Sequence, residues 1–336
     1  MKPLVSILIP AFNSQRWIAE TIESALGQTW SHKEIIVVDD GSTDQTLDVA
    51  SQFASRGVKV VTQKNSGAAE ARNKAFSLSR GDYIQWLDAD DLLAPNKIEK
   101  QANALNDSPS RRTLLSSAWG YFIYRPSKAK FDPTSVWCDL SPVEWQLRYF
   151  EQNHWMQTST WLVSRDLTEA AGPWDSRLLG DDDGEYFSRV MLASDGIRFV
   201  PEARVFYRRG LGTLSFVGQS NRKLEAQHLS MRLRIGHLRS VEDSDRVRTA
   251  CLEYLQRYLV YFYPEHPEIV QQMEQMASEL GGRLHTPALP KKYAWIQKLF
   301  GWTTAKQTQL IYNQCKSSLL RSWDKAMFQF GQGRQI

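Results

Sequence analysis

The segment WLDADD, residues 86–91, places three carboxylates, Asp88, Asp90 and Asp91, directly after an apolar run. Crowded carboxylates repel one another, and a divalent cation removes that repulsion. Their hard oxygens select Mg²⁺ or Mn²⁺, ions that keep open positions for substrate phosphates. The alternative is that these acids are loop and helix-capping residues, and Asp91 suits that role because helix N-termini favour acids. Three acids emerging together from a predicted strand favour the metal site.

The first 95 residues alternate apolar, β-branched runs with segments of helical periodicity. This alternation predicts a parallel sheet covered on both faces, and therefore an α/β fold. Ligands of such sheets bind beyond the carboxyl ends of the strands, so Phe12, Asp39, Asn65 and Asp88 should meet at one edge. The expected strands are 4–9, 34–38, 58–61 and 83–87; the expected helices run from about 17 to 27, from a cap at Ser42 or Thr43 to about 54, and from 65 to 78.

The remainder of the chain has a different character. Residues 96–220 are mixed and loop-rich, as expected for a half that completes a site, whereas helical periodicity returns from residue 221. We therefore expect a domain at 1–220 with two halves (1–95 and 96–220), followed by a helical region at 221–336. The family resemblance of the motifs described below makes 1–220 the catalytic domain, 1–95 its nucleotide-binding half and 96–220 its acceptor or catalytic half. One predicted apolar stripe of that region comprises Ile311, Cys315, Leu319 and Trp323.

The charge is distributed unevenly. Residues 281–336 contain nine Lys or Arg and one acid, a net +8, whereas the whole chain carries +4. Because cations alternate with Trp, Phe and Leu in KKYAWIQKLFGW (291–302) and LLRSWDKAMFQF (319–330), residues 283–336 suit a helix lying in an anionic membrane interface. A helical appendage packed on the catalytic domain is the equally weighted alternative. No recognised motif accompanies the charge, so nucleic acid is not an expected partner.

The length of the apolar runs and the cysteine content predict the cellular compartment of the protein. No run approaches the ~18–20 apolar residues that a spanning helix needs. The three cysteines, at 138, 251 and 315, are far apart and odd in number, which fits a reducing cytosol. We therefore expect a cytoplasmic protein, either free or peripheral on the cytoplasmic face of the membrane.

Four segments resemble, in order and separation, the signatures of family 2 glycosyltransferases with the GT-A fold. They are VSILIPAFN (5–13), VVDDGSTDQT (37–46), NSGAAEARN (65–73) and WLDADD (86–91). The resemblance implies a GT-A fold with a C-terminal helical appendage, and it makes the last segment the DxD-type element that binds a nucleotide-sugar through a metal. UDP-sugars are the commonest donors in this family, so UDP is the implied nucleotide.

The resemblance also implies roles for single residues. Pro10 and Phe12 would line the nucleobase pocket, with Phe12 stacking on the base. Asp39 would accept a hydrogen bond from a pyrimidine imide N–H, while Asp40 holds the turn. Asn65 and Arg72 match polar positions near the nucleotide, although Arg72 could instead form a salt bridge on the helix surface. Asp88 would lie near ribose and metal, and Asp90 would be the principal metal ligand.

A catalytic base is expected in LLGDDDGEYFSRV, residues 178–190. An acceptor hydroxyl must lose its proton to become a good nucleophile. The segment resembles the family's acidic motif, and aligning Arg189 with the motif's arginine makes Asp183 the base. Asp stands where the family usually has Glu, and Asp181 is an extra acid, so Asp182 remains an alternative. An acidic helix N-terminus stabilised by the helix dipole is a further reading, compatible with a base.

The segment GIRFVPEARVFYRRGLGTLS, residues 196–215, resembles the part that closes the family's site. Arg208 and Ser215 match positions that contact the diphosphate in some members. Many members carry a His nearby, whereas this chain has Tyr207-Arg208-Arg209. A guanidinium can bind phosphate but cannot coordinate metal, so the cation would rely on Asp90, waters and phosphates.

The implied reaction is a single displacement at the anomeric carbon, which inverts its configuration. The acceptor is expected to be a glycan or a lipid-linked saccharide near residues 154–158, where Trp155 could stack on a sugar ring or belong to the core. Dehydrogenase and P-loop motifs are absent, and the six histidines are dispersed. The rival from another class is an inactive GT-A-like module that binds a nucleotide or a glycan.

Overall fold

The computed structural model describes residues 2–105, 110, 112–209 and 220–332. Its first layer is a five-stranded sheet in the order β3-β2-β1-β4-β7. The first four strands are parallel and β7 is antiparallel to β4. This confirms the predicted α/β class. The strands are β1 (Val5–Ala11), β2 (Lys33–Asp39), β3 (Val58–Thr62), β4 (Tyr83–Trp86) and β7 (Val163–Ser164).

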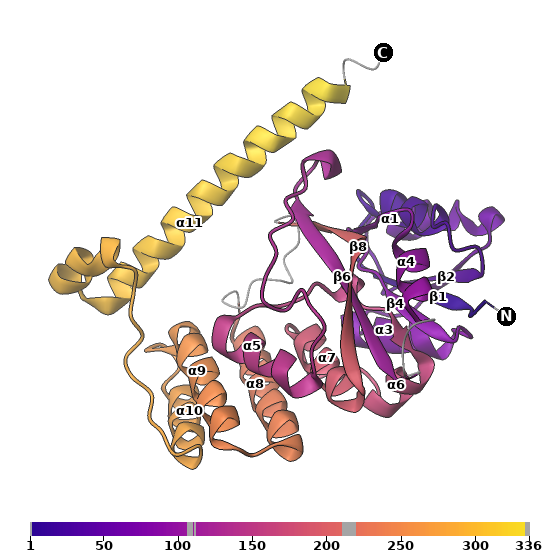
Figure 1. Ribbon diagram of the computed structural model, residues 1–336. Helices are drawn as coiled ribbons and strands as arrows, with labels where there is room; N and C mark the ends of the chain where they lie inside the picture. The colour runs from indigo at the N-terminus through magenta and orange to yellow at the C-terminus, as the bar shows by residue number, and fades with distance from the viewer. Residues whose placement is uncertain (1, 106–109, 111, 210–219, 333–336) are drawn as a thin grey trace.

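The sheet forms here because its central strands are continuous apolar runs. Val5 to Ile9 of β1 and Ile36 to Val38 of β2 are almost completely buried, as expected for a sheet covered on both faces. Helices α1, α2 and α3 connect its strands, as the sequence predicts (Figure 1). Their bounds are α1 (Ile18–Leu26), α2 (Thr46–Ser51) and α3 (Ala68–Ser77).

The predicted start of the second helix is wrong. Helix α2 begins at Thr46 without a side-chain cap, and neither Ser42 nor Thr43 caps it. Ser42 accepts a hydrogen bond from the backbone of Asn13, and Thr43 donates to the Asn13 side chain. These two residues therefore join the loops after β1 and β2 instead of starting a helix.

A second, three-stranded sheet has the order β5-β8-β6. Strand β8 pairs in parallel with β6 over ten residue pairs and in antiparallel with β5. Strand β5 immediately follows the WLDADD segment, so this sheet holds the acidic loop against the end of β8. The elements of this part are β5 (Leu92–Leu93), α4 (Lys97–Ala104), β6 (Thr113–Phe122), α5 (Pro142–Gln152), α6 (Arg165–Ala171), α7 (Asp182–Ala193) and β8 (Gly196–Arg208).

The helices after residue 220 pack directly against this body. One continuous hydrophobic core includes Trp86 and Tyr186 together with Leu224, Tyr254 and Met273. The apolar stripe of α9 is buried as its periodicity predicts. These helices are α8 (Asn221–Val241), α9 (Asp245–Phe262) and α10 (Pro267–Glu279). Their shared core means that α8 to α10 stabilise the catalytic part.

The last helix, α11 (Ala294–Gln332), differs from all the others. It bends at Gly301, whose φ is 83°, and then runs along the outside of the molecule (Figure 1). Ile311, Leu319 and Trp323 of the predicted apolar stripe are more than half exposed. This stripe therefore does not pack on the catalytic domain. Among the described residues, no helix is both long and apolar enough to cross a bilayer.

The tight approach of β1 to the turn before β4 yields a stability prediction. A Cβ at Gly81 would lie 2.6 Å from the backbone nitrogen of Ser6, whereas a Cβ at Gly236 in α8 would meet no atom within 4 Å. We expect Gly81→Ala to lower the free energy of unfolding by about 1–3 kcal/mol through overpacking. Gly236→Ala should raise it by up to about 1 kcal/mol, because alanine favours a helix. Urea denaturation measures both, and equal values for the two variants would contradict the prediction.

Candidate active site

The loops at the carboxyl ends of β1 and β2 form one side of the site. Register places Ala11 of β1 beside Asp39 of β2, so both strands end at the same edge. Phe12 follows β1 and is 46% exposed, whereas Pro10 is only partly buried and Asn65 is exposed. An exposed ring at a polar strand edge has an open face for a planar ligand.

Asp39 and Asp40 are adjacent and buried, but their contacts differ. Asp40 accepts hydrogen bonds from the side chain of Gln63 at 2.8 Å and from the backbone N–H groups of Ser66 and Gly67 at 2.9 and 2.8 Å. It therefore holds the turn before α3, the role predicted for it. The Oδ2 atom of Asp39 accepts from Thr62, but its Oδ1 atom is buried without a partner.

A buried oxygen without a donor is costly, so it indicates a missing ligand group. The Oδ1 atom of Asp39 suits the imide N–H of a pyrimidine. Close approach of the flanking loops maintains this arrangement, because Gly41 adopts φ 69° and a Cβ there would lie 2.8 Å from the nitrogen of Asn65. The turn after β2 thus needs glycine.

Arg72 connects three of the predicted motifs. It extends from α3, and it donates from Nη2 to Asp88 at 2.8 Å and from Nη1 to Asp182 at 2.7 Å. Its guanidinium also stacks on Trp174, 4.4 Å from the ring. Two nearby carboxylates more than offset the effect of burial and raise the pKa of Arg72. The salt bridge foreseen for Arg72 exists, but it is buried within the site and does not lie on a helix surface.

The acids of the WLDADD segment separate into different roles. Asp91 is fully buried; it accepts from the backbone N–H of Arg208 at 2.8 Å and from the side chain of Gln157 at 2.5 Å. Burial, reinforced by Asp90 and Asp88, raises the pKa of Asp91 well above its usual range. Asp91 is thus a structural residue that joins the acidic loop to β8, in line with the alternative considered for it.

Asp90 has the environment expected of a cation ligand. Burial and the nearby Asp88 raise its pKa to about 6. No other described residue donates a hydrogen bond to its carboxylate, and a divalent cation would relieve both effects. No three His, Cys, Asp or Glu side chains within the described ranges form a preassembled metal cage. The residues present therefore fit an ion held by Asp90 whose coordination is completed by phosphate and water oxygens.

Arg208 is held by contacts with the protein. Its side chain is 2.7 Å from Glu20, donates to the backbone oxygen of Asp90 at 2.8 Å and stacks on Trp17. The guanidinium is fully buried in this arrangement. The predicted diphosphate contact remains a prediction, and the contacts present make Arg208 a residue that positions the Asp90 backbone. Ser215, assigned to the same role, lies outside the described residues.

The three consecutive acids at the start of α7, one at its N-cap and two in its first turn, have three different partners. Asp181, with φ 55°, accepts from Ser230 and Gln227 of α8 and so anchors the start of α7 there. Asp182 is paired with Arg72. Asp183 accepts a 3.1 Å hydrogen bond from Thr158 and lines a cavity of about 1250 Å³.

This arrangement bears on the choice between Asp182 and Asp183. Asp183 is the one of these two that lines the cavity, whereas Asp182 is held by a cation. Burial, followed by the neighbouring Asp182 and Asp181, raises the pKa of Asp183 to about 7. A carboxylate with that pKa can accept a proton near neutral pH. The geometry thus favours Asp183 as the general base.

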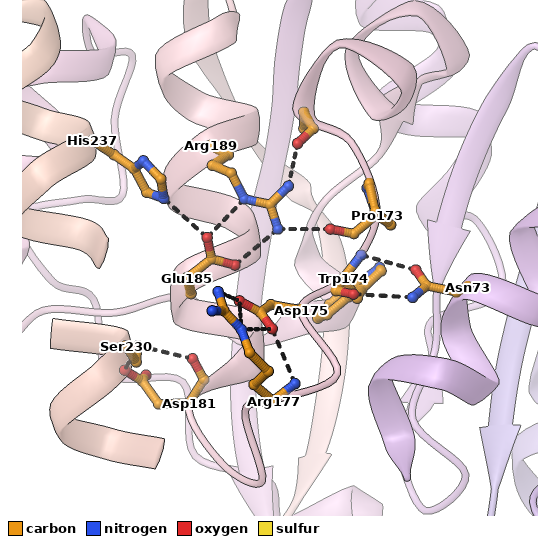
Figure 2. Close-up of polar contacts among 11 residues, drawn as sticks. Asn73, Pro173, Trp174, Asp175, Arg177, Asp181, Glu185, Arg189, Ser230 and His237 are labelled. Atoms are coloured by element: carbon orange, nitrogen blue, oxygen red, sulfur yellow. Dashed lines mark hydrogen bonds and ion pairs between the residues drawn. The ribbon is translucent and has the colours of Figure 1, made fainter. Parts of the chain in front are cut away.

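Helix α7 is held by the arginine that was used for alignment. Arg189 forms an ion pair with Glu185, and it donates to the backbone oxygens of Ala171 and Pro173 (Figure 2). Figure 2 also shows Asn73 of α3 making two hydrogen bonds with the backbone of Trp174, at 2.8 and 3.0 Å. These contacts fix α7, and therefore Asp183, relative to α3 and Arg72.

The cavity beside Asp183 has an aromatic wall. Trp155 is 38% exposed, and its ring centroid lies 4.6 Å from Trp119 and 5.9 Å from Tyr207. This arrangement places Trp155 at the cavity surface, where an apolar ring face can stack on a sugar. Asn313, Gln314 and Ser317 of α11 also line this cavity.

Sequence reasoning missed several residues of this site. Gln157 and Thr158, which hold Asp91 and Asp183, belong to the segment expected near the acceptor, but the pattern assigned no role to them. The link from Asp181 to α8 and the α11 wall had no detectable signal, because both depend on contacts between residues more than 40 positions apart.

The structure is an α/β protein with acidic side chains at one strand edge beside a large cavity, and comparisons with known proteins show what it resembles. Residues 6–121 match the model of the family described as Glycosyl transferase family 2. Those residues are similar to glycosyltransferase family 2 domains, and the chain has the GT-A fold.

Two curated relatives resemble the N-terminal part of the chain. An uncharacterized glycosyltransferase of Rickettsia typhi, RT0329, is 44% identical over 34% of this chain and 35% of its own length. The putative teichuronic acid biosynthesis glycosyltransferase TuaG of Bacillus subtilis is 36% identical over 39% of this chain and 56% of its own. The matched stretch thus spans about a third of the first relative and about half of the second.

A solved structure extends the likeness to most of the fold. S. aureus TarS 1–349 in complex with UDP-GlcNAc aligns with a TM-score of 0.64 over 83% of this chain and 80% of that chain. The sequence identity is 19%, so this likeness concerns the fold.

The separation of roles between Asp90 and Asp91 is testable without substrate. We expect Asp91→Ala to lower the free energy of unfolding by about 1–3 kcal/mol, because it leaves the buried Arg208 N–H and the Gln157 amide without their acceptor. Asp90→Ala should cost less, because no neighbouring described donor loses a partner. Urea denaturation without added metal compares the two, and a larger loss for Asp90→Ala would contradict the assignment.

Proposed function

We propose that this protein is an inverting glycosyltransferase that moves a sugar from a nucleotide-sugar, with UDP as the nucleotide, to a hydroxyl of a glycan or a lipid-linked saccharide. One observation carries the proposal. At the start of α7, Asp182 is paired with Arg72 and Asp181 is bound to α8, whereas Asp183, which lines the cavity as Asp181 does, has a pKa of about 7.

The donor would bind at the edge formed by β1, β2 and β4. Phe12 would stack on the base beside Pro10, Asp39 would accept the imide N–H, and Asn65 and Asp88 would complete the nucleotide contacts. The unpartnered Oδ1 of Asp39 supports a uracil or thymine ring at this point. The solved complexes of TarS with UDP-GlcNAc and UDP add support from the same fold.

Asp90 would hold the divalent cation, Mn²⁺ or Mg²⁺. When bound, such an ion neutralises charge that develops on the diphosphate leaving group. Arg72 holds Asp88 in place beside Asp90, and Arg208 fixes the backbone of Asp90. The protein thus orients the ligand oxygens before the donor arrives.

Asp183 would take the proton from the acceptor hydroxyl as that oxygen attacks the anomeric carbon. Thr158 orients one carboxylate oxygen of Asp183, and the backbone N–H of Gly184 donates to the other at 2.9 Å. Attack from the face opposite the nucleotide in one displacement inverts the configuration. Trp155 would support the acceptor ring at the cavity wall.

Peripheral contact with an anionic membrane through residues 283–336, on the cytoplasmic face, is part of this proposal.

The second candidate function is that of a catalytically inactive module that binds a nucleotide or a glycan. The intact environment of Asp183 favours the enzyme, because a binding module has no need for a carboxylate with a raised pKa in the cavity.

The base assignment predicts a pH dependence. Asp183 must be ionised to accept a proton, so kcat/KM should rise with pH through about 7 and level off above it. Arg72 lowers the pKa of Asp183, so Arg72→Met should move the midpoint to higher pH. Asp183→Asn should reduce transfer by at least a thousandfold while the Kd for UDP changes less than threefold. A comparable loss of both would contradict the assignment of the base.

The donor site predicts metal-dependent nucleotide binding. Calorimetric titration with UDP, GDP and dTDP, each with Mn²⁺ and with EDTA, measures it. We expect binding of UDP that is at least tenfold tighter with Mn²⁺, and Asp90→Ala should abolish that difference. Asp39→Asn should weaken UDP binding at least tenfold, because an amide N–H would face the imide N–H.

Two outcomes of the titration would count against the proposal. Equal affinity with Mn²⁺ and with EDTA would remove the metal role of Asp90. Metal-dependent binding of UDP without transfer of any sugar to any saccharide tested would favour the inactive module.

A further inference from the structure

The second part of α11, residues 302–332, has two faces of opposite character. Its inner face lines the cavity with Asn313, Gln314, Ser317, Ser318 and Arg321. Leu310 and Cys315 also line the cavity, so this face is mainly polar although it faces the protein. A helix that packs on a globular domain normally turns its apolar side inward, so α11 has the reverse arrangement.

The outer face of α11 is apolar and exposed. Tyr312, Leu319, Trp323 and Phe330 are separated by seven, four and seven residues, a spacing that places them on one side of a helix. Their exposed fractions are 51, 72, 67 and 74%, and Leu320 and Met327 beside them are exposed as well. Large apolar side chains gathered on one surface indicate a partner.

Contacts at both ends fix this orientation. Near its start, Lys306 forms an ion pair with Glu265 at 2.9 Å, and Trp302 donates to the backbone oxygen of Pro287. Near its end, Asp324 accepts from Arg125 at 2.5 Å and from the backbone N–H of Tyr124 at 2.9 Å. The helix thus runs along the outside of the body between these two anchors (Figure 1).

The positive charge of α11 favours an anionic lipid surface over a second copy of the helix as the partner of this face. Beyond the bend, α11 exposes Lys316 and Lys325, and its single acid, Asp324, is engaged by Arg125. Two copies of such a helix would repel each other if their outer faces met. An anionic lipid surface attracts the same cations while its acyl region accepts the apolar side chains.

We propose that the outer face of α11, formed by Tyr312, Leu319, Leu320, Trp323, Met327 and Phe330, is a docking surface for an anionic lipid bilayer. The helix lies on the bilayer, because no described helix has the length and apolarity to cross it. Docking through the outer face leaves the polar inner face on the cavity, so the cavity beside Asp183 comes to lie next to the lipid surface.

Vesicle flotation tests the proposal on the full chain. We expect the protein to float with phosphatidylcholine vesicles containing 30% phosphatidylglycerol, and the bound fraction should be at least fivefold lower with pure phosphatidylcholine. Leu319→Glu combined with Trp323→Glu should reduce the bound fraction at least tenfold. The matched control is Val241→Glu, which introduces an acid at an exposed apolar residue of α8 and should float like the unmodified protein.

Other outcomes would overturn the proposal. Equal flotation of the double variant and the unmodified protein would reject the outer face as the docking surface. A dimer in analytical ultracentrifugation that the double variant dissociates, with no flotation of either protein, would assign the face to a second copy of the chain. Urea denaturation of each variant reports whether it is folded, and none of these readouts requires nucleotide binding or sugar transfer, so failure of the docking proposal and failure of the proposed function are distinguishable.

Discussion

The buried guanidinium of Arg72 between Asp88 and Asp182 is the interaction on which the rest of the site depends. It joins Asp88 of the WLDADD loop to Asp182 at the start of α7, although these two residues are 94 positions apart in the sequence. Removing one partner of a buried ion pair typically costs about 3–5 kcal/mol, because the other charge stays buried without compensation. Loss of Arg72 would leave two carboxylates facing each other. The positive charge of Arg72 thus allows the WLDADD loop and the acidic start of α7 to lie next to each other.

The site is otherwise an arrangement of acids with unequal environments. Asp40, Asp91 and Asp181 have their oxygens engaged by protein donors, and each connects two segments of the chain. Asp39, Asp90 and Asp183 each retain carboxylate capacity that the protein does not fully use. In this second group, Asp39 could accept a hydrogen bond from a nucleobase, Asp90 could bind a cation and Asp183 could accept a proton. Structural acids therefore create the rigid frame in which neighbouring acids remain available for ligands.

Helix α11 relates this chemistry to its surroundings. Its polar inner face completes the cavity and its apolar outer face points away from the protein, so one helix contributes to two surfaces. The buried stripe of α9 shows the opposite case: Val247, Cys251 and Leu255 satisfy their periodicity within the core. Periodicity alone predicted a stripe on both helices, and it did not distinguish a stripe that packs from a stripe that is exposed.

The sequence by itself determined the parallel sheet, the strand edge that carries Asp39 and Asp88, and the separation of turn-holding Asp40 from its neighbour. These features are local, because apolar runs form buried strands and polar residues at strand ends share one edge. Only the tertiary structure paired Asp182 with Arg72 and left Asp183 on the cavity, assigned Arg72 to two carboxylates, buried Arg208 against Glu20 and exposed the outer face of α11. Those outcomes depend on contacts between distant segments, and no spacing within a single segment encodes which distant group a side chain will meet.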